Sequence, residues 1–450
     1  MKNLYKFALL LLAICVPLCG NAGSVTVKTQ KAAGETMTFA TNGDISLTLT
    51  WGNSVVEEIG STGEPFDVTV KDATLTISSD ANLTRFYAAD NELTEIDLSG
   101  VATTLQKLNC SSNKLTALNL SACTKLNDLD CQDNQIETIT FRTMPIIRNL
   151  NCANNKLQTF GFTLAINLEN ILADNNVITS LPTTKCAALK NLYCQNNELA
   201  NLTLSSNTKL KNLAITNNAI SELDLSANTL LEEAWLSQNA LTSLDVTPTS
   251  KLIYLIANDN QLTSMTWTKN EPATLKYLDL SGNELFPLYF PTVYTTSGGD
   301  LIPYYNLGNQ LPFTLASEDF NINERQDWNL IINRNAWQTV LRPTIEYVCG
   351  ETVLEKGVDY KFQSASSFNT TFLKGYNNVV ARITPFRYYP DLVYESKPFN
   401  VIDPTVGIDI MNSETQNTTQ EIYTLEGIRV DGKNLKKGVY IINGKKAIIR

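Results

Sequence analysis

The sequence contains no histidine among its 450 residues. Without an imidazole the chain has no Ser-His-Asp or Cys-His catalytic site, no histidine general base and no histidine-ligated metal. Its nine cysteines form no CxxC pair, so a zinc site is not predicted. The glycines are sparse and fall at turns, not in a phosphate-binding loop. These absences exclude most enzyme classes, and we expect no cofactor.

Paired carboxylates are the remaining route to catalysis or to metal binding. Asp128 and Asp130 would project from one face of a strand about 7 Å apart, with Asp133 nearby. Such a group suits a glycosidase pair or a weak calcium site. A solvated strand face beside Lys107 explains the same residues without a ligand. We therefore predict that the protein is not an enzyme and holds no metal.

Basic runs and long apolar segments are also scarce. The formal net charge is −10, and such an acidic chain is not expected to bind nucleic acid or an anionic membrane. Residues 1–22, with Lys2 and Lys6 before an apolar run and small residues near Ala22, are typical of a cleaved export signal. Lipid attachment at Cys19 is the alternative. The run is too short for a membrane helix, so we expect a secreted or cell-surface protein with no transmembrane segment.

The chain is dominated by a repeat that lies between Leu83 and Pro287. Its pattern is LxxLxLxxNxL, as in residues 126–136, and it recurs every 21 residues with irregular steps only at the two ends. A fixed period in the twenties predicts a solenoid, in which stacked units share one core. The asparagines at the ninth position of the pattern are Asn91, Asn113, Asn134, Asn155, Asn176, Asn197, Asn218, Asn239, Asn260 and Asn283.

Each unit alternates apolar and polar residues, as a half-buried strand does. The first, fourth and sixth positions should point inward, and a second apolar pair such as Leu202 and Leu204 predicts a second short extended segment. The ninth-position amide can both donate and accept, so it should satisfy backbone groups at the turn in neighbouring units. Cysteines in the sixth column are expected to be buried free thiols that act as small apolar fillers. They are Cys110, Cys131, Cys152 and Cys194.

This pattern resembles the leucine-rich repeat family, and most closely the short-repeat arrays of secreted Bacteroidetes proteins. The resemblance implies a mainly β fold with a right-handed solenoid of about ten 21-residue repeats over residues 80–290. Short alternating runs over residues 23–79, such as residues 45–51, predict a small β cap that covers the first unit.

Beyond the repeats the pattern changes. Residues 291–402 contain isolated strands between turns, as in a β-sandwich, and resemble the immunoglobulin-like modules that follow such repeats in Bacteroidetes proteins, although Cys349 has no partner. Residues 403–420 are polar and predict a linker. Residues 421–450, with Gly427, Gly438, Tyr440 and a basic end, resemble part of the Bacteroidetes sorting domain for outer-membrane secretion. A plain terminal β module is the alternative.

The candidate site lies on the predicted concave sheet, where positions three and five of each unit should face solvent. In the second half of the array these positions are aromatic or aliphatic. A contiguous apolar surface usually marks a partner, and Trp and Tyr are typical anchors. The alternative is that the rings only pack on one another across units. The candidate residues are Leu172, Tyr193, Trp235, Tyr254, Ile256 and Tyr277.

Two functions fit this surface. In the first, an exported monomer binds a protein ligand, for adhesion or for interaction with a host or partner. In the second, the protein captures a glycan, with Trp235, Tyr193 and Tyr254 stacked on sugar rings and asparagines bonded to hydroxyls. Those asparagines have an alternative role, as an amide ladder that ties the sheet together. They are Asn149, Asn170, Asn191 and Asn212.

Overall fold

The computed structural model divides into two compact units, Met1–Asn309 and Gln310–Arg450. It describes residues 23–285 except 142–145, 161–164 and 268–273, and then 304–308, 310, 312, 319–321, 325–326, 344–364, 367–384, 394–403, 408–411, 422–425, 428–430, 438–442 and 445–449. In these residues no helix is long and apolar enough to cross a membrane. The export segment 1–22 and the predicted linker, apart from 403 and 408–411, lie outside the described residues.

A β cap closes the N-terminal end of the first unit. Alternation of buried and exposed residues produces its strands, which are β1 (Gly23–Thr29), β2 (Thr36–Thr41), β3 (Ile45–Trp51), β4 (Val56–Ser61), β5 (Phe66–Thr69), β6 (Thr74–Ser79) and, after the first repeat turn, β8 (Leu93–Asp97). Five of them form an antiparallel sheet in the order β4-β3-β6-β1-β8. The cap also pairs β2 antiparallel with the first strand of the repeats, so the open end of the core is covered.

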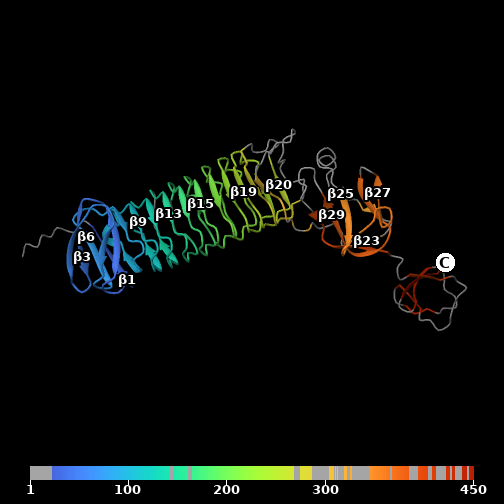
Figure 1. Ribbon diagram of the computed structural model, residues 1–450, viewed down its shortest axis with the longest axis horizontal. Helices are drawn as coiled ribbons and strands as arrows, with labels where there is room; N and C mark the ends of the chain where they lie inside the picture. The colour runs from blue at the N-terminus through green and yellow to red at the C-terminus, as the bar shows by residue number, and fades with distance from the viewer. Residues whose placement is uncertain are drawn as a thin grey trace, which may run out of the picture. The chain divides into compact units, whose positions relative to one another are not determined.

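Eleven short parallel strands, one from each unit, stack into the long sheet of the solenoid (Figure 1). They are β7 (Arg85–Tyr87), β9 (Lys107–Asn109), β11 (Asp128–Asp130), β13 (Asn149–Asn151), β14 (Asn170–Leu172), β15 (Asn191–Tyr193), β16 (Asn212–Ala214), β17 (Glu233–Trp235), β19 (Tyr254–Ile256), β21 (Tyr277–Asp279) and β22 (Tyr304–Asn306). All pair in register, so equivalent positions form straight columns. The predicted mainly β solenoid is confirmed, and β22 adds one strand that the repeat pattern did not predict.

The opposite side of the solenoid holds shorter elements, because 21 residues leave little chain after the sheet strand and its turn. The structure pairs β10 (Ala117–Asn119) with β12 (Thr138–Thr140), and β18 (Ser243–Asp245) with β20 (Ser264–Thr266). Two single 3₁₀ turns, η1 (Ser99–Val101) and η2 (Thr183–Lys185), complete this side among the described residues. The second extended segment is therefore present in part of the array.

The core between the two sides consists of stacked apolar columns. Leu126, Leu129 and Cys131 in one unit are at most 2% exposed. All four sixth-position cysteines are buried and free. Burial raises the pKa of the Cys110 thiol to about 12, so it stays protonated at neutral pH and packs as a small apolar group.

Ninth-position asparagines bridge the turn to the preceding unit. The Asn176 amide oxygen accepts a hydrogen bond from the Leu157 backbone N–H at 2.9 Å. Its amide nitrogen donates to the backbone oxygens of Cys152, Ala173 and Asp174 at 3.0, 3.2 and 3.2 Å. The same bonds recur from unit to unit, so each buried amide joins two successive turns.

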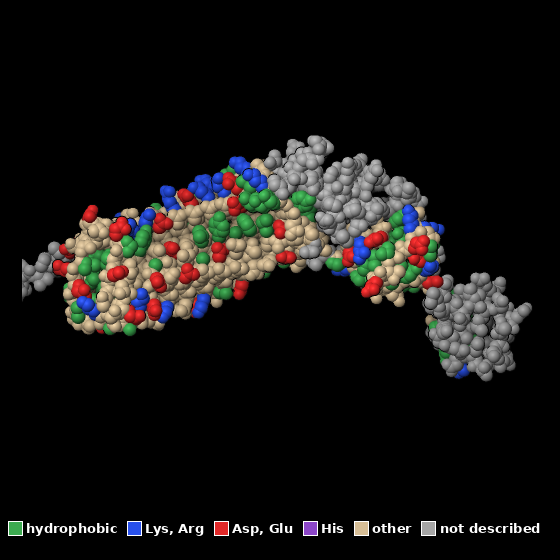
Figure 2. Space-filling view, viewed as in Figure 1, with side chains coloured by type: hydrophobic (Ala, Val, Ile, Leu, Met, Phe, Trp, Pro, Cys, Tyr) green, Lys and Arg blue, Asp and Glu red, His purple; other side chains and the backbone are tan. Residues whose placement is uncertain are grey.

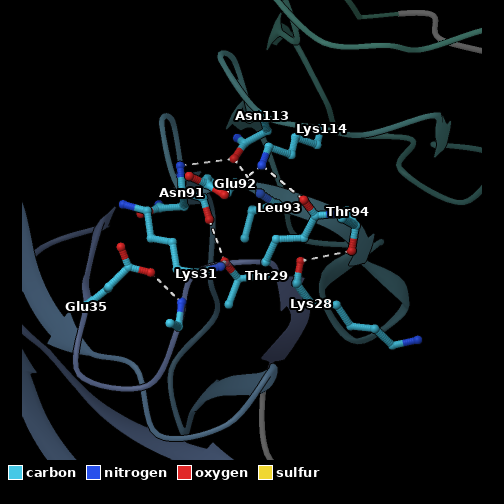
Figure 3. A network of polar contacts seen from close by, with 12 residues as sticks. Lys28, Thr29, Lys31, Glu35, Asn91, Glu92, Leu93, Thr94, Asn113 and Lys114 are labelled. Atoms are coloured by element: carbon cyan, nitrogen blue, oxygen red, sulfur yellow. Dashed lines mark hydrogen bonds and ion pairs between the residues drawn. The ribbon is translucent and has the colours of Figure 1, made fainter.

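The first two amides of this ladder lie beside the cap (Figure 3). The Asn113 oxygen accepts from the backbone N–H groups of Asn91 and Leu93, at 3.0 and 2.9 Å. The Thr29 hydroxyl donates to the Asn91 carbonyl at 2.7 Å. On the outside, the Lys114 ammonium lies 2.7 Å from a Glu92 carboxylate oxygen. The cap and the first two repeats are thus joined by backbone-directed bonds.

The second unit contains two facing sheets and a terminal sheet. Its strands are β23 (Asp319–Asn321), β24 (Arg325–Gln326), β25 (Thr344–Cys349), β26 (Thr352–Val353), β27 (Tyr360–Ser364), β28 (Ser367–Phe372), β29 (Tyr376–Thr384), β30 (Tyr394–Glu395), β31 (Phe399–Ile402), β32 (Ile408–Met411), β33 (Ile422–Thr424), β34 (Gly438–Ile442) and β35 (Lys445–Ile449). Tyr347 and Phe399 of the β23-β31-β29-β25-β26 sheet contact Phe372 of the β24-β28-β27 sheet, with ring centroids 4.8 and 5.9 Å apart. The last four strands form their own sheet in the order β32-β35-β34-β33.

Candidate functional site

The third and fifth positions of each repeat are the first and last residues of its three-residue sheet strand, and they lie on the outer face on either side of a buried central residue. In β19, Leu255 is fully buried between the half-buried Tyr254 and Ile256. In β17, Trp235 is 38% exposed. Because the strands pair in register, these outward residues form two continuous columns on the face of the sheet. Figure 2 shows hydrophobic side chains gathered over the part of the solenoid that carries β15 to β19.

Four aromatic rings on this face form a stack, which we call the aromatic ladder: Trp235, Tyr254, Tyr277 and Tyr304. The centroid distance from Trp235 to Tyr254 is 6.4 Å, with 14° between the ring planes. The next two steps are closer, at 4.5 Å and 10° from Tyr254 to Tyr277 and at 4.6 Å and 7° from Tyr277 to Tyr304. The two tyrosine steps match the separation of neighbouring strands, about 4.8 Å, because Tyr254, Tyr277 and Tyr304 are paired in one column, whereas Trp235 contacts Tyr254 from the adjacent column.

Stacking determines which part of each ring a ligand can reach. Both faces of Tyr277 are covered by its neighbours, and only its edge remains available. Ring edges carry the positive end of the aromatic quadrupole. Desolvation and the neighbouring Tyr254 and Tyr304 raise the pKa of the Tyr277 hydroxyl, so it is a neutral hydrogen-bond donor at physiological pH. The ladder therefore presents electropositive edges and hydroxyl donors.

A shallow groove of about 390 Å³ runs between the ladder and the neighbouring column at the last two strands. Tyr277 and Tyr304 line one side, and Ile256, Asp279 and Asn306 line the other. One oxygen of the Asp279 carboxylate accepts from the Ser281 backbone N–H at 3.0 Å, and the other accepts from the Asn306 amide at 3.3 Å. The groove thus has an aromatic wall and a wall that is partly apolar and partly polar.

Leu172 and Tyr193 lie apart from the ladder. They are paired neighbours on β14 and β15, and both are half-buried. The next residue in their column is Ala214, which is only 2% exposed and separates Tyr193 from Trp235. The six predicted residues therefore form two groups, with Trp235, Tyr254, Ile256 and Tyr277 in the larger one.

Tyr304 is the member of the ladder that the sequence interpretation missed. It is 61% exposed and pairs with Tyr277 through β22. A degenerate repeat was available as a signal, because Ile302, Tyr305, Leu307 and Gln310 keep the LxxLxLxxN spacing with substitutions. The irregular sequence that precedes it concealed this last unit.

The asparagine column on the same face is bonded along its length. The Asn149 amide donates to Asp128 at 2.7 Å, Asn170 donates to Asn149 at 2.6 Å, and Asn212 donates to Asn191 at 2.6 Å. Asn191 donates to Asn170 in the same way. These amides are engaged with one another, as the amide-ladder alternative predicts.

The acidic residues beside this column are also engaged. Asp128 lies 3.6 Å from the Lys107 ammonium. Burial raises the pKa of the Asp130 carboxyl, and its oxygen accepts from the Gln132 backbone N–H at 3.2 Å. Within the described residues, no group of three or more acidic or cysteine side chains is arranged to hold a metal ion. These contacts correspond to a solvated strand face.

Comparison with known proteins finds similarity in solved structures only. No protein-family model matches the sequence, and no curated protein matches it. The functional domain of InlJ from Listeria monocytogenes is 19% identical over 74% of this chain and 94% of that chain, with a TM-score of 0.36. YopM from Yersinia enterocolitica is 19% identical over 52% of this chain and 57% of that chain, with a TM-score of 0.38. A chain of the Drosophila Toll–Spatzle complex is 20% identical over 52% of this chain and 39% of that chain, with a TM-score of 0.40.

Proposed function

We propose that this protein is an exported, non-enzymatic binding protein that holds a protein ligand on the sheet face of its solenoid. The aromatic ladder is the observation that carries the proposal. Its four rings form a continuous, partly exposed surface beside a groove, and clusters of Trp and Tyr are typical anchors of protein interfaces. Large concave or flat surfaces on repeat proteins suit extended partners better than small molecules.

The stack counts against the glycan alternative. Sugar rings pack against the faces of aromatic rings, and Tyr254, which the glycan alternative assigns to a sugar, is already stacked against Trp235 on one face and Tyr277 on the other. The asparagines that would bond to hydroxyls donate instead to one another along the column. A protein ligand needs neither feature, because it can contact ring edges, tyrosine hydroxyls and the aliphatic side chain of Ile256 together.

The test uses the mature chain that we expect, Gly23–Arg450. This chain is used to select binders from a library of displayed short random peptides, and in parallel it is applied to a glycan array. Each is repeated with Tyr254→Ala/Tyr277→Ala and with Tyr87→Ala. Tyr87 is the matched control, because it is a half-buried aromatic residue on the same sheet face at the first repeat. We expect peptides that bind the parent chain and the control but lose binding to the double variant.

Two outcomes would contradict this proposal. Binding of a sugar by the parent chain and by Tyr87→Ala, but not by the double variant, would support glycan capture. Ligands that bind all three chains equally would remove the ladder from the site. Tyr277→Phe, which keeps the ring and removes the hydroxyl, separates loss of a donor from loss of the stack.

A further inference from the structure

In the second half of the solenoid, the segments that lead into the sheet strands are basic, whereas the segments that run from the asparagine turns to the opposite side of the solenoid are acidic. The segments that lead into the strands, 186–190, 207–211, 228–232, 249–253 and 274–276, contain a single acidic residue, Glu232, and five lysines. We call these lysines the lysine edge: Lys190, Lys209, Lys211, Lys251 and Lys276. The segments after the asparagine turns, 197–206, 218–227, 239–248 and 260–267, contain no Lys or Arg. Their acidic residues are Glu198, Glu222, Asp224 and Asp245.

The lysine edge borders the aromatic ladder. Lys276 immediately precedes Tyr277, and Lys251 lies three residues before Tyr254, at the bend that leads into β19. Figure 2 shows Lys and Arg side chains gathered along one edge of the solenoid, next to hydrophobic side chains.

Part of this positive charge is not neutralised by the residues that the structure describes. The Lys190 and Lys211 ammonium groups each lie 2.7 Å from a carboxylate oxygen, of Glu169 and Glu232 respectively. Lys251 and Lys276 are exposed and make no ion pair with any residue that the structure describes. These two lysines are the ones nearest the stacked tyrosines, whose outward edges and hydroxyls also favour negative charge.

We propose that the ligand presents an acidic, extended protein segment, with its carboxylates over Lys251 and Lys276 and its apolar residues in the groove beside the ladder. This inference rests on the proposed function, because it names the chemistry of the ligand at that same face. Carboxylates on alternate residues of an extended chain lie about 6.5–7 Å apart and point to one side, while the intervening side chains point to the other. Nucleic acid fits less well, because its phosphates are spaced evenly along the backbone and would also cross Glu233 and Asp279, whereas a peptide can place apolar residues there.

The test uses the peptides selected on the full chain Gly23–Arg450. The best ladder-dependent peptide is synthesised with a fluorophore, together with a counterpart in which every Glu and Asp is replaced by Gln and Asn, and short oligothymidine is the nucleic-acid probe. Binding is measured by fluorescence anisotropy to the parent chain and to Lys251→Glu/Lys276→Glu. The control is Lys125→Glu/Lys156→Glu, which makes the same change in net charge at exposed lysines in the first half of the solenoid.

We expect enrichment of acidic peptides, and at least about tenfold weaker binding at low ionic strength for the Lys251→Glu/Lys276→Glu variant and for the amide counterpart. The control should bind as the parent does. Selection of neutral or basic peptides, or equal binding of the peptide to all three chains, would contradict an acidic ligand but would keep the aromatic ladder as the proposed binding site. Tighter binding of oligothymidine than of the peptide would overturn it in favour of nucleic acid. Failure to obtain any ladder-dependent peptide would overturn the proposed function itself.

Discussion

The asparagine at the turn of each repeat carries a specific and measurable part of the stability of the solenoid. In Asn176→Ala, the three carbonyls that receive the amide keep another donor each: Asn155 for Cys152, Asn197 for Ala173 and the Asn154 backbone for Asp174. The Leu157 N–H is different, because the Asn176 oxygen is the acceptor assigned to it and Leu157 is fully buried. The loss of stability therefore comes mainly from one buried backbone N–H without an acceptor, which costs about 1–3 kcal/mol.

Urea unfolding followed by circular dichroism, with hydrogen exchange over residues 150–165, provides the measurement. We expect a lower unfolding midpoint for Asn176→Ala and faster exchange at the Leu157 amide. Gln158→Ala is the control, because Gln158 is exposed and its replacement should stay within about 0.5 kcal/mol of the parent. Equal midpoints for the two variants, with unchanged exchange at Leu157, would refute this account of the turn.

Asn176→Asp extends the same reasoning. The new carboxylate keeps an acceptor for Leu157 but directs negative charge at three carbonyl oxygens in a buried site. The variant should be less stable than Asn176→Ala at neutral pH. Burial and the carbonyls should raise the pKa of this carboxyl in the folded state, so part of the loss should be recovered as the pH falls and the group is protonated. A stability difference from the parent that does not change with pH would contradict a buried charge.

Three further predictions concern other parts of the chain. Thiol titration of native Gly23–Arg450 should detect Cys349 alone among its seven cysteines, since the other six are buried, and unfolding should expose all seven; a count near one after unfolding would mean that the cysteines are not free. Hydrogen bonds from Lys374 and Tyr376 hold the pKa of Asp359 at about 2, below its usual 3.8. This carboxylate therefore stabilises the second unit above pH 3.8 and loses that effect as the pH falls towards 2. Asp359→Asn should reduce the change of this unit's melting temperature with pH over that range. Mass spectrometry of the exported protein should give an N-terminus at Gly23, and a lipid on Cys19 would contradict it.

The period of the repeat made most of the fold predictable, because a 21-residue unit with one strand and one turn leaves few alternatives. The eighth position of the repeat has a feature that the sequence interpretation overlooked. Asp133, Asn154, Asn175, Asn196 and Asn217 all have φ between 54° and 57°, and short polar residues tolerate this left-handed conformation best. Their side chains form a second, exposed ladder, for example Asn175 to Asn154 at 2.7 Å. The run of Asp and Asn at this position contained the signal.

The site was less predictable than the fold. Column positions follow from the period, so Trp235, Tyr254 and Tyr277 could be assigned to one face from sequence. The orientation of the rings depends on rotamers and on the spacing of the strands, neither of which appears in the residue pattern. The sequence therefore left open whether the aromatic residues form a binding surface or pack on one another, and the stack now shows that they pack on one another while their edges remain exposed.

Packing among the rings and binding by the rings are compatible for a physical reason. Each stacked pair contributes about 0.5–1.5 kcal/mol beyond its burial, which holds the tyrosine side chains in place before any ligand arrives. A ligand that meets an ordered ladder does not have to immobilise those side chains, and this lowers the entropic cost of association. The same order predicts that Tyr277→Ala weakens both the solenoid and the site, whereas Tyr277→Phe keeps the stack and removes only the hydroxyl. If binding falls in the alanine variant in proportion to the lost stability while the phenylalanine variant binds as the parent does, ring packing rather than hydrogen bonding carries the recognition.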